Sequence, residues 1–386
     1  MSGTTPLLFD LLIVFAAARL AGELFERLHL SAVVGEILAG VLVGPSVLGL
    51  AHVTPALITV ATLGVVVLQF SVGLETKPSD FFKVGWLAIV VALLGVGLSM
   101  GGGFLFGRIA GYTMVAALFV GTAIASTSVG VTARVLKDTG LLRTTAARLV
   151  LGAAVIDDVL GPMVLAVVVG ISSGHADMLK ALAILGEIAL FLAFELWLAP
   201  RLVRRHAHLM DRLRTQNAPF IVAVVIMLFT AATAEWLGLA AVVGAFLAGM
   251  MLAETEDRYC IARDTRPLYD WLVPYFFAVT GMQVKLALFA DLRILALGVV
   301  LTAVAVAAKV LGGGAGAIGL GWRRALSVGV GMIPRAEIGL IVASVGLATK
   351  VLDASAYAVI MFAIVATVLI APLAVPVAFR KGPAEG

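Results

Sequence analysis

The stretch AVVGEILAG at residues 32–40 returns as AVVGAFLAG at residues 241–249, with seven identities in nine positions and a shift of 209 residues. The same shift places IASTSVG (124–130) on IPRAEIG (333–339) and AVIDDVL (154–160) on AIVATVL (363–369). One offset that holds in three separate segments indicates that a unit of about six helices was duplicated.

The composition around these segments is that of an integral membrane protein. Of 386 residues, 62% are hydrophobic and 13% are charged, which is too apolar for a soluble domain. The sole cysteine, Cys260, excludes an internal disulfide.

Apolar segments of roughly 17–25 residues can cross a bilayer as helices. We place thirteen, at residues 5–24, 31–50, 56–74, 84–107, 113–135, 146–170, 179–200, 218–237, 239–255, 268–286, 291–319, 324–348 and 354–379.

The basic residues predict the orientation of these spans. With the N-terminus outside and the C-terminus inside, twenty of the 27 lysines and arginines fall in cytoplasmic segments and five on the other side, the expected bias. The duplicated copies are seven spans apart, so equivalent helices run in opposite directions. We therefore predict an all-α polytopic membrane protein with two inverted six-helix repeats and a linker helix, an architecture typical of secondary transporters.

Two adjacent acids, Asp157 and Asp158, interrupt the otherwise apolar sixth span. Ionisable residues at bilayer depth are rare and usually mark an ion pathway. Neighbouring residues point about 100° apart around a helix, so both carboxylates can border one cavity. Such a pair can bind protons or transported metal cations in competition. The alternative is a polar kink beside Pro162.

Lys309 lies deep in the eleventh span, too far from either end to reach water easily. It needs an anionic partner, and Asp157 and Asp158 are the best candidates. The alternative is a lysine held by backbone carbonyls beside the glycines at 312–314. In the repeat it aligns with Met100, so the two copies differ in their charged residues.

The fifth and twelfth spans carry matching signs of a helix break. The fifth contains Ser126, Thr127 and Ser128, and its repeat mate contains Pro334, Arg335 and Glu337. Such residues let a membrane helix be interrupted, which frees carbonyls and helix ends for ions. For the hydroxyl run alone, close helix packing is an equal alternative. The charges of the second set can offset those of half-helix ends, and the alternative is that they pair with other buried groups. We expect two discontinuous, crossing helices.

Several motifs resemble those of the NapA-type bacterial sodium/proton antiporters of the second cation/proton antiporter family. They are GTAIASTSVGVTARVL (121–136), GAAVIDDVLG (152–161), AKVLGG (308–313), GVGMIPRAEIGLI (329–341), GEILAGVLVGP (35–45) and VGLE (72–75). The resemblance implies that Asp158 is the principal ion and proton carrier and that Asp157 pairs with Lys309. Thr127 and Ser128 match one helix breakpoint, with Ser126 beside them, and residues 334–337 match the other.

The resemblance also implies the domain organisation. It predicts an interface domain at residues 1–76 and 216–288, a mobile core domain at residues 77–175 and 289–386, and a linker helix at residues 176–215. Family members are homodimers. One departure is Ile333-Pro334-Arg335-Ala336-Glu337, where a small residue before the proline and a glycine after the arginine are expected. This departure can change the geometry of the second breakpoint and the preference for one ion over another.

The expected function is antiport of cytoplasmic Na⁺ or Li⁺ against external protons in a bacterial inner membrane, and the resemblance implies that it is electrogenic, with two protons exchanged for one sodium ion. K⁺/H⁺ exchange and organic-anion symport on the same fold are the alternatives within transport. An intramembrane aspartyl protease is disfavoured because its two acids come from two helices, whereas Asp157 and Asp158 are consecutive. We expect no enzymatic activity, no cofactor and no nucleic-acid partner; the expected partners are lipid, monovalent cations, protons and a second copy of the chain.

Overall fold

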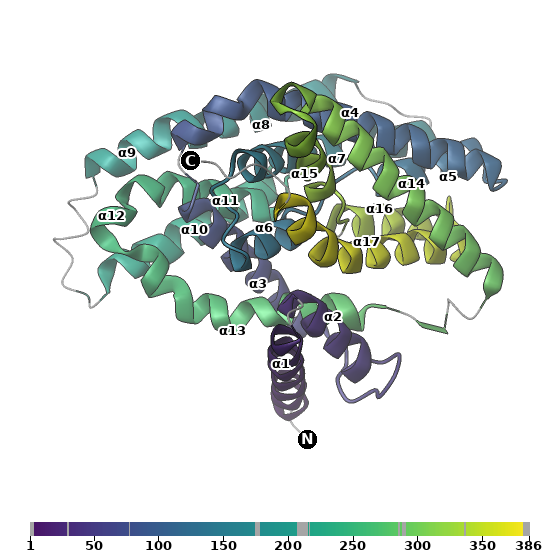
Figure 1. Ribbon diagram of the computed structural model, residues 1–386, viewed down its shortest axis with the longest axis horizontal. Coiled ribbons are helices and arrows are strands. Elements are labelled where there is room, and N and C mark those ends of the chain that lie inside the picture. Colours follow the sequence, from purple (N-terminus) through teal and green to yellow (C-terminus); the bar gives the residue numbers. More distant parts are fainter. Residues whose placement is uncertain are drawn as a thin grey trace.

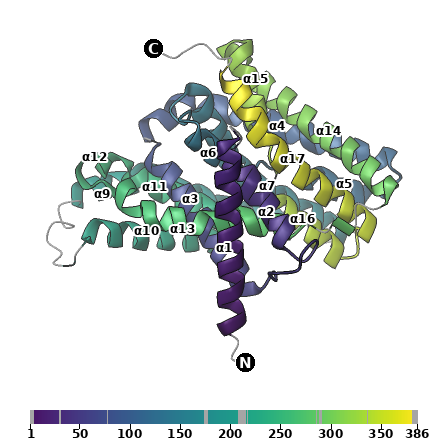
Figure 2. The same cartoon turned by 60° about the horizontal axis from the view of Figure 1, so that its bottom comes forward.

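The computed structural model describes residues 4–28, 31–76, 78–173, 178–206, 215, 217–284, 286–287, 291–335 and 337–380. All regular secondary structure within these ranges is helical. The helices pack side by side in one molecule (Figure 1), and the N-terminal helix projects from the rest (Figure 2). This architecture agrees with the all-α class predicted from the sequence.

The first half of the chain supplies the helices of the first copy. They are α1 (Thr4–Arg27), α2 (Ala32–Val43), α3 (Pro55–Leu74), α4 (Pro78–Ile109), α5 (Met114–Ala123), α6 (Val129–Asp138) and α7 (Thr145–Ser173). A helical segment follows that is interrupted by a π-helical turn. It consists of α8 (Met178–Ala193), the π turn Phe194–Leu198 and α9 (Ala199–His206).

The second half repeats this order. Its helices are α10 (Ala218–Trp236), α11 (Ala241–Leu252), α12 (Glu256–Tyr259), α13 (Ile261–Met282), α14 (Leu292–Gly316), α15 (Trp322–Gly331), α16 (Glu337–Ala348) and α17 (Ala354–Arg380). The shift of 209 residues carries the first residue of α2 to that of α11, and the first residue of α7 to that of α17. The helix boundaries thus follow the repeat found in the sequence.

Each of the thirteen predicted spans overlaps at least one helix. Among the described residues, six helices have a stretch long and apolar enough to cross a membrane by length and composition: α3, α4, α7, α10, α14 and α17. The span predicted at 31–50 is too long, because α2 ends at Val43 ahead of Gly44 and Pro45. Proline disfavours a helical conformation in the residue before it. The number of crossings, their orientation and the inverted sense of the repeat stay predictions.

The helices form two packed groups. The first group consists of α1, α2, α3, α10, α11 and α13, and the second of α4, α5, α6, α7, α14, α15, α16 and α17. Figure 1 shows the second group with α14 alongside α4. Contacts between the groups involve α6 against α2 and α3, and α17 against α2. The predicted domain division follows these same elements and stays a prediction.

Glycines allow the helices of the first group to cross with their backbones in contact. A Cβ atom at Gly249 in α11 would lie 2.1 Å from the carbonyl oxygen of Phe70 in α3, and one at Gly73 would lie 2.2 Å from that of Phe246. Small residues are the usual means of such close approach between membrane helices. The α3–α11 crossing is therefore fixed by two residues with no side chain.

We expect Gly249→Ala to lower the stability of the fold markedly, because its methyl group would overlap backbone atoms that cannot move independently. Overpacking of this kind costs about 1–3 kcal/mol or more. Gly97→Ala is the matched control, since a Cβ atom there meets no heavy atom within 4 Å. Thermal unfolding in detergent measures both. Equal midpoints for the two variants would contradict the crossing geometry.

Candidate functional site

The two interrupted helices meet at their breaks. Residues 124–128 separate α5 from α6, and the stretch that begins at Met332 separates α15 from α16. The backbone N–H of Ser128 donates to the carbonyl oxygen of Pro334 at 2.7 Å. Thr132 in α6 donates its hydroxyl to the carbonyl oxygen of Gly331, also at 2.7 Å. Each broken helix therefore satisfies part of the unpaired backbone of the other.

The predicted hydroxyl residues lie inside this junction. Ser126, Thr127 and Ser128 are all buried. Thr127 Oγ1 has two acceptors within reach, the Asp157 carboxylate at 2.7 Å and the Met332 carbonyl oxygen at 3.3 Å. Thr127 therefore links the first break both to Asp157 and to the residue that follows α15.

Lys309 and Asp157 form a fully buried ion pair. Lys309 Nζ lies 2.6 Å from Asp157 Oδ2, and both side chains are 0% exposed. The same carboxylate oxygen accepts the hydrogen bond from Thr127. The other oxygen, Oδ1, is buried with no hydrogen-bond partner among the described residues. A charge in such a place is tolerable only when an opposite charge and hydrogen bonds compensate for the lost water.

Asp158 is also buried, with 5% of the residue exposed, and it is the more accessible of the two acids. It interacts electrostatically with Lys309. Lys309 therefore interacts with both carboxylates, which lie on adjacent positions of α7. The second acid could accept a small cation or a proton while the first remains paired with the lysine.

Arg335 occupies the second break and is 0% exposed. Its guanidinium donates to the carbonyl oxygens of Met332 at 2.8 Å and Ile333 at 3.0 Å, and to that of Ala305 in α14 at 3.2 Å. These carbonyls include the end of α15, where the helix dipole favours a cation. Arg335 therefore lies at the end of α15, and its functional role there stays a prediction. It also interacts electrostatically with Asp157.

Two parts of the predicted second breakpoint fall outside the described structure. Glu337 begins α16, but its side chain lies outside the described residues, as does Ala336. Pro334 is described and contributes the carbonyl group that accepts from Ser128. The effect of having Ile333 and Ala336 in place of a smaller residue and a glycine therefore stays a prediction from the sequence.

In the described part of the chain, no group of three His, Cys, Asp or Glu side chains could hold a resident metal.

A second polar cluster, which is not predicted from the sequence, joins α6 to the first helix group. Arg134 of α6 lies 3.7 Å from Glu36 of α2, and Lys137 lies 3.0 Å from Glu75 of α3. Both cations also lie over the ring of Tyr269 in α13, at 5.4 Å and 4.8 Å from its centroid. In the sequence, Arg134 and Lys137 contribute only to the prediction of the orientation. Only their three-residue spacing within one helix could have indicated a shared partner.

A cleft of about 540 Å³ lies between the two helix groups, with walls from α3, α7, α10, α11, α13 and α16. Polar groups in its wall include Thr62, Glu235 and Gln283, and Pro162 of α7 lines it one turn beyond Asp158. By the predicted orientation these lining residues belong to the outer halves of their helices, whereas the Arg134 cluster belongs to the cytoplasmic ends.

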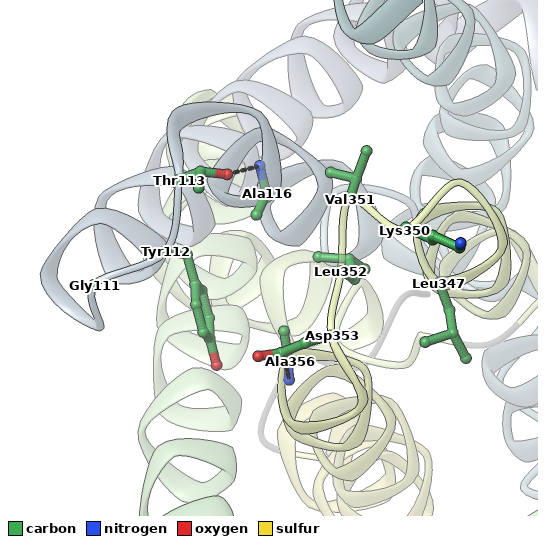
Figure 3. Close-up of a pocket in the computed structure, with 10 residues that line it drawn as sticks. All are labelled: Gly111, Tyr112, Thr113, Ala116, Leu347, Lys350, Val351, Leu352, Asp353 and Ala356. Atoms are coloured by element: carbon green, nitrogen blue, oxygen red, sulfur yellow. Dashed lines mark hydrogen bonds between the residues drawn. The ribbon is translucent and has the colours of Figure 1, made fainter.

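A different hollow, of about 500 Å³, lies where the turn before α5 meets the turn before α17 (Figure 3). None of the predicted site residues lines it. Its polar groups include helix caps: Thr113 accepts from the backbone N–H of Ala116, and Asp353 accepts from that of Ala356. Figure 3 shows Thr113 beside Ala116 and, on the other segment, Asp353 beside Ala356. This hollow therefore follows from two helix starts and is separate from the acid pair.

Comparison with known proteins gives a consistent result. Residues 11–381 match the family described as "Sodium/hydrogen exchanger, transmembrane". The chain is 30% identical to the high-affinity Na⁺/H⁺ antiporter NhaS3 of Synechocystis, over 95% of this chain and 88% of that protein. It is also 30% identical to the Na⁺/H⁺-K⁺ antiporter GerN of Bacillus cereus, over 94% of each chain. The sodium proton antiporter MjNhaP1 of Methanocaldococcus jannaschii has a similar fold, with TM-score 0.70 at 16% identity over 98% of this chain and 100% of that one.

We expect Lys309→Ala to destabilise the protein by up to about 3–5 kcal/mol, because it leaves the buried Asp157 carboxylate without its cation. Asp157→Ala is expected to have a similar effect, and the double variant should recover part of the loss. Thermal unfolding in detergent provides the measurement. Glu23→Gln, which breaks an exposed pair with Arg27, is the control and should change little. Additive losses in the double variant would contradict a mutual pair.

Proposed function

This chain belongs to the sodium/hydrogen exchanger family of cation/proton antiporters, and from that premise we propose that it exchanges cytoplasmic Na⁺ or Li⁺ for external protons. The observation that carries the proposal is the fully buried pair of Asp157 and Lys309 at the junction of two broken helices. The family consists of membrane transporters and not enzymes. A bacterial inner membrane is the proposed location, and a homodimer the proposed assembly.

The proposed chemistry is competition for one group of ligands. In the inward-facing state, Asp158 and Lys309 each release a proton to the cytoplasm, the neutral lysine leaves Asp157, and the two carboxylates bind Na⁺. Thr127 and Ser128 stand beside the acids and are proposed to contribute oxygen atoms. In the outward-facing state, one proton returns to Asp158 and one to Lys309, Na⁺ is released, and the lysine pairs with Asp157 again. The Asp157–Lys309 pair in the structure supports the second of these states.

Competition of this kind has an electrical consequence. If two protons enter for each Na⁺ that leaves, one net charge crosses the membrane in each cycle. A membrane potential contributes about 2.3 kcal/mol per elementary charge per 100 mV. An inside-negative potential could therefore drive Na⁺ export without a pH gradient. The second acid and the buried lysine are the groups that make such a stoichiometry chemically accessible.

The arrangement of the two helix groups supports alternating access. The cleft between them lies on the predicted outer side, and the pairs of Arg134 and Lys137 with Glu36 and Glu75 join the groups at the predicted cytoplasmic ends. We propose that the structure represents an outward-open state. Movement of the second group, as the core domain, would break these pairs and close the cleft.

Potassium is the alternative transported ion. The name of the relative GerN includes K⁺ as well as Na⁺, so this fold can serve both ions. The residue before Pro334 is Ile333, where the family resemblance leads us to expect a smaller side chain. A bulkier residue beside the second break changes the space near the ligands. Transport assays that replace Na⁺ by Li⁺ or K⁺ discriminate between the two proposals.

Asp158→Asn is expected to abolish Na⁺-driven proton movement, because an amide carries no exchangeable charge at this site. The measurement is the pH change inside proteoliposomes after addition of Na⁺, Li⁺ or K⁺. Glu23→Gln is the matched control, since it neutralises an exposed acid remote from the pair. Full Na⁺-driven exchange by Asp158→Asn would refute the assignment. Exchange by the wild-type protein with K⁺ alone would favour the alternative.

Accessibility of the cleft gives a second test. In a Cys260→Ser background, Thr62→Cys should react with a membrane-impermeant thiol reagent added outside, because Thr62 lines the cleft. Combining Arg134→Gln with Lys137→Gln should reduce this labelling, since the cytoplasmic pairs that favour the outward-open state are lost. Arg143→Gln, an exposed arginine on the same predicted side, is the control. Unchanged or increased labelling in the double variant would contradict the proposed closure.

A further inference from the structure

Lys309 rests directly against a residue that has no side chain. A Cβ atom built on Gly95 of α4 would lie 3.2 Å from Lys309 Nζ and 3.3 Å from its Cδ. Both distances are shorter than ordinary van der Waals contact. The space that a side chain of residue 95 would need is therefore occupied by the lysine and its ammonium group.

The surrounding helix packing explains why this contact is so close. Figure 1 shows α4 and α14 side by side, and these helices are in extensive contact. A Cβ atom at Gly312 in α14 would lie 2.6 Å from the carbonyl oxygen of Leu94 and 2.9 Å from the Cα atom of Gly95. Residues three apart share one face of a helix, so Lys309 and Gly312 both face α4. A long side chain fits into this backbone-to-backbone contact only where the opposite residue is glycine.

The lysine has little freedom to retreat from an added methyl group. Its side chain is 0% exposed, and Nζ is 2.6 Å from the Asp157 carboxylate. A methyl group at residue 95 would have to displace the ammonium by a few tenths of an ångström. Displacement of that size stretches or bends the ion pair, while the α4 and α14 backbones hold the remaining atoms in place.

We propose that Gly95 is a positioning residue for ion exchange: its bare backbone forms the seat that holds the Lys309 ammonium against Asp157. Gly95 does not touch the transported ion and acts only through the lysine. The proposal rests on the proposed antiport, because it assigns the seat a role in the competition between Lys309 and Na⁺ for the same carboxylate.

A double-mutant cycle tests the contact itself, without any transport measurement. Gly95→Ala should lower the thermal unfolding midpoint in Na⁺-free detergent by about 2–4 °C. In a Lys309→Ala background the same change should have no such effect, because the methyl group then has room. Gly97→Ala, on the same helix with no heavy atom within 4 Å of its Cβ position, should be neutral in both backgrounds.

An equal loss in both backgrounds would overturn the proposal, because the obstacle would then be the α4–α14 backbone contact. No loss in either background would also overturn it. If Gly95→Ala alone does not fold, the double variant decides the question. Folding of Gly95→Ala/Lys309→Ala supports the seat, and its failure under conditions where Lys309→Ala alone folds refutes it.

A Na⁺ titration tests the functional part. We expect the Na⁺ concentration that gives half of the maximal thermal stabilisation to fall about threefold in Gly95→Ala, because a weakened ion pair competes less with Na⁺. A purely structural defect would not tighten Na⁺ binding. An unchanged or higher concentration would overturn this role of Gly95. If Na⁺ does not stabilise the wild-type protein either, the proposed sodium exchange is wrong. The double-mutant cycle still tests the contact between Gly95 and Lys309 in that case.

Discussion

The structure depends on the exclusion of water from one ion pair. Asp157 and Lys309 are each fully buried, and each charge would be intolerable there without the other. The two residues come from opposite halves of the chain, on helices that the repeat does not align with each other. The two halves are therefore joined electrostatically as well as by packing. The buried carboxylates of such a site therefore need a proton, the lysine or a metal cation beside them at every stage of exchange.

Backbone contacts provide the precision that such a pair needs. Glycines bring α4 against α14 and α3 against α11, and the two helix breaks satisfy each other through Ser128 and Pro334. Arg335 donates hydrogen bonds to the carbonyl oxygens of Met332 and Ile333, which lie in the second break. Backbone atoms have fixed positions, so contacts made through them hold the side chains of the site more firmly than packing between long side chains would.

Much of this arrangement could be predicted from the sequence because its signals are local or periodic. The repeat offset, the interrupted fifth and twelfth spans and the isolated charges at 157, 158 and 309 are all visible in the residue order. The contacts of Arg134 with Glu36 and of Lys137 with Glu75 could not be predicted from the residue order. They join segments about 60 to 100 residues apart, and a basic residue near a helix end usually faces water. Hydropathy alone places the end of α2 too late in the chain, because it does not take account of Gly44 and Pro45.

The Thr127 hydroxyl has one consequence that goes beyond its place in the junction. It carries a single hydrogen, yet two acceptors lie within its reach: the Asp157 carboxylate at 2.7 Å and the Met332 carbonyl oxygen at 3.3 Å. Rotation about one bond turns the hydrogen from one acceptor to the other. Thr127 can thus donate to only one of these acceptors at a time, either to the acid or to the backbone of the opposite broken helix.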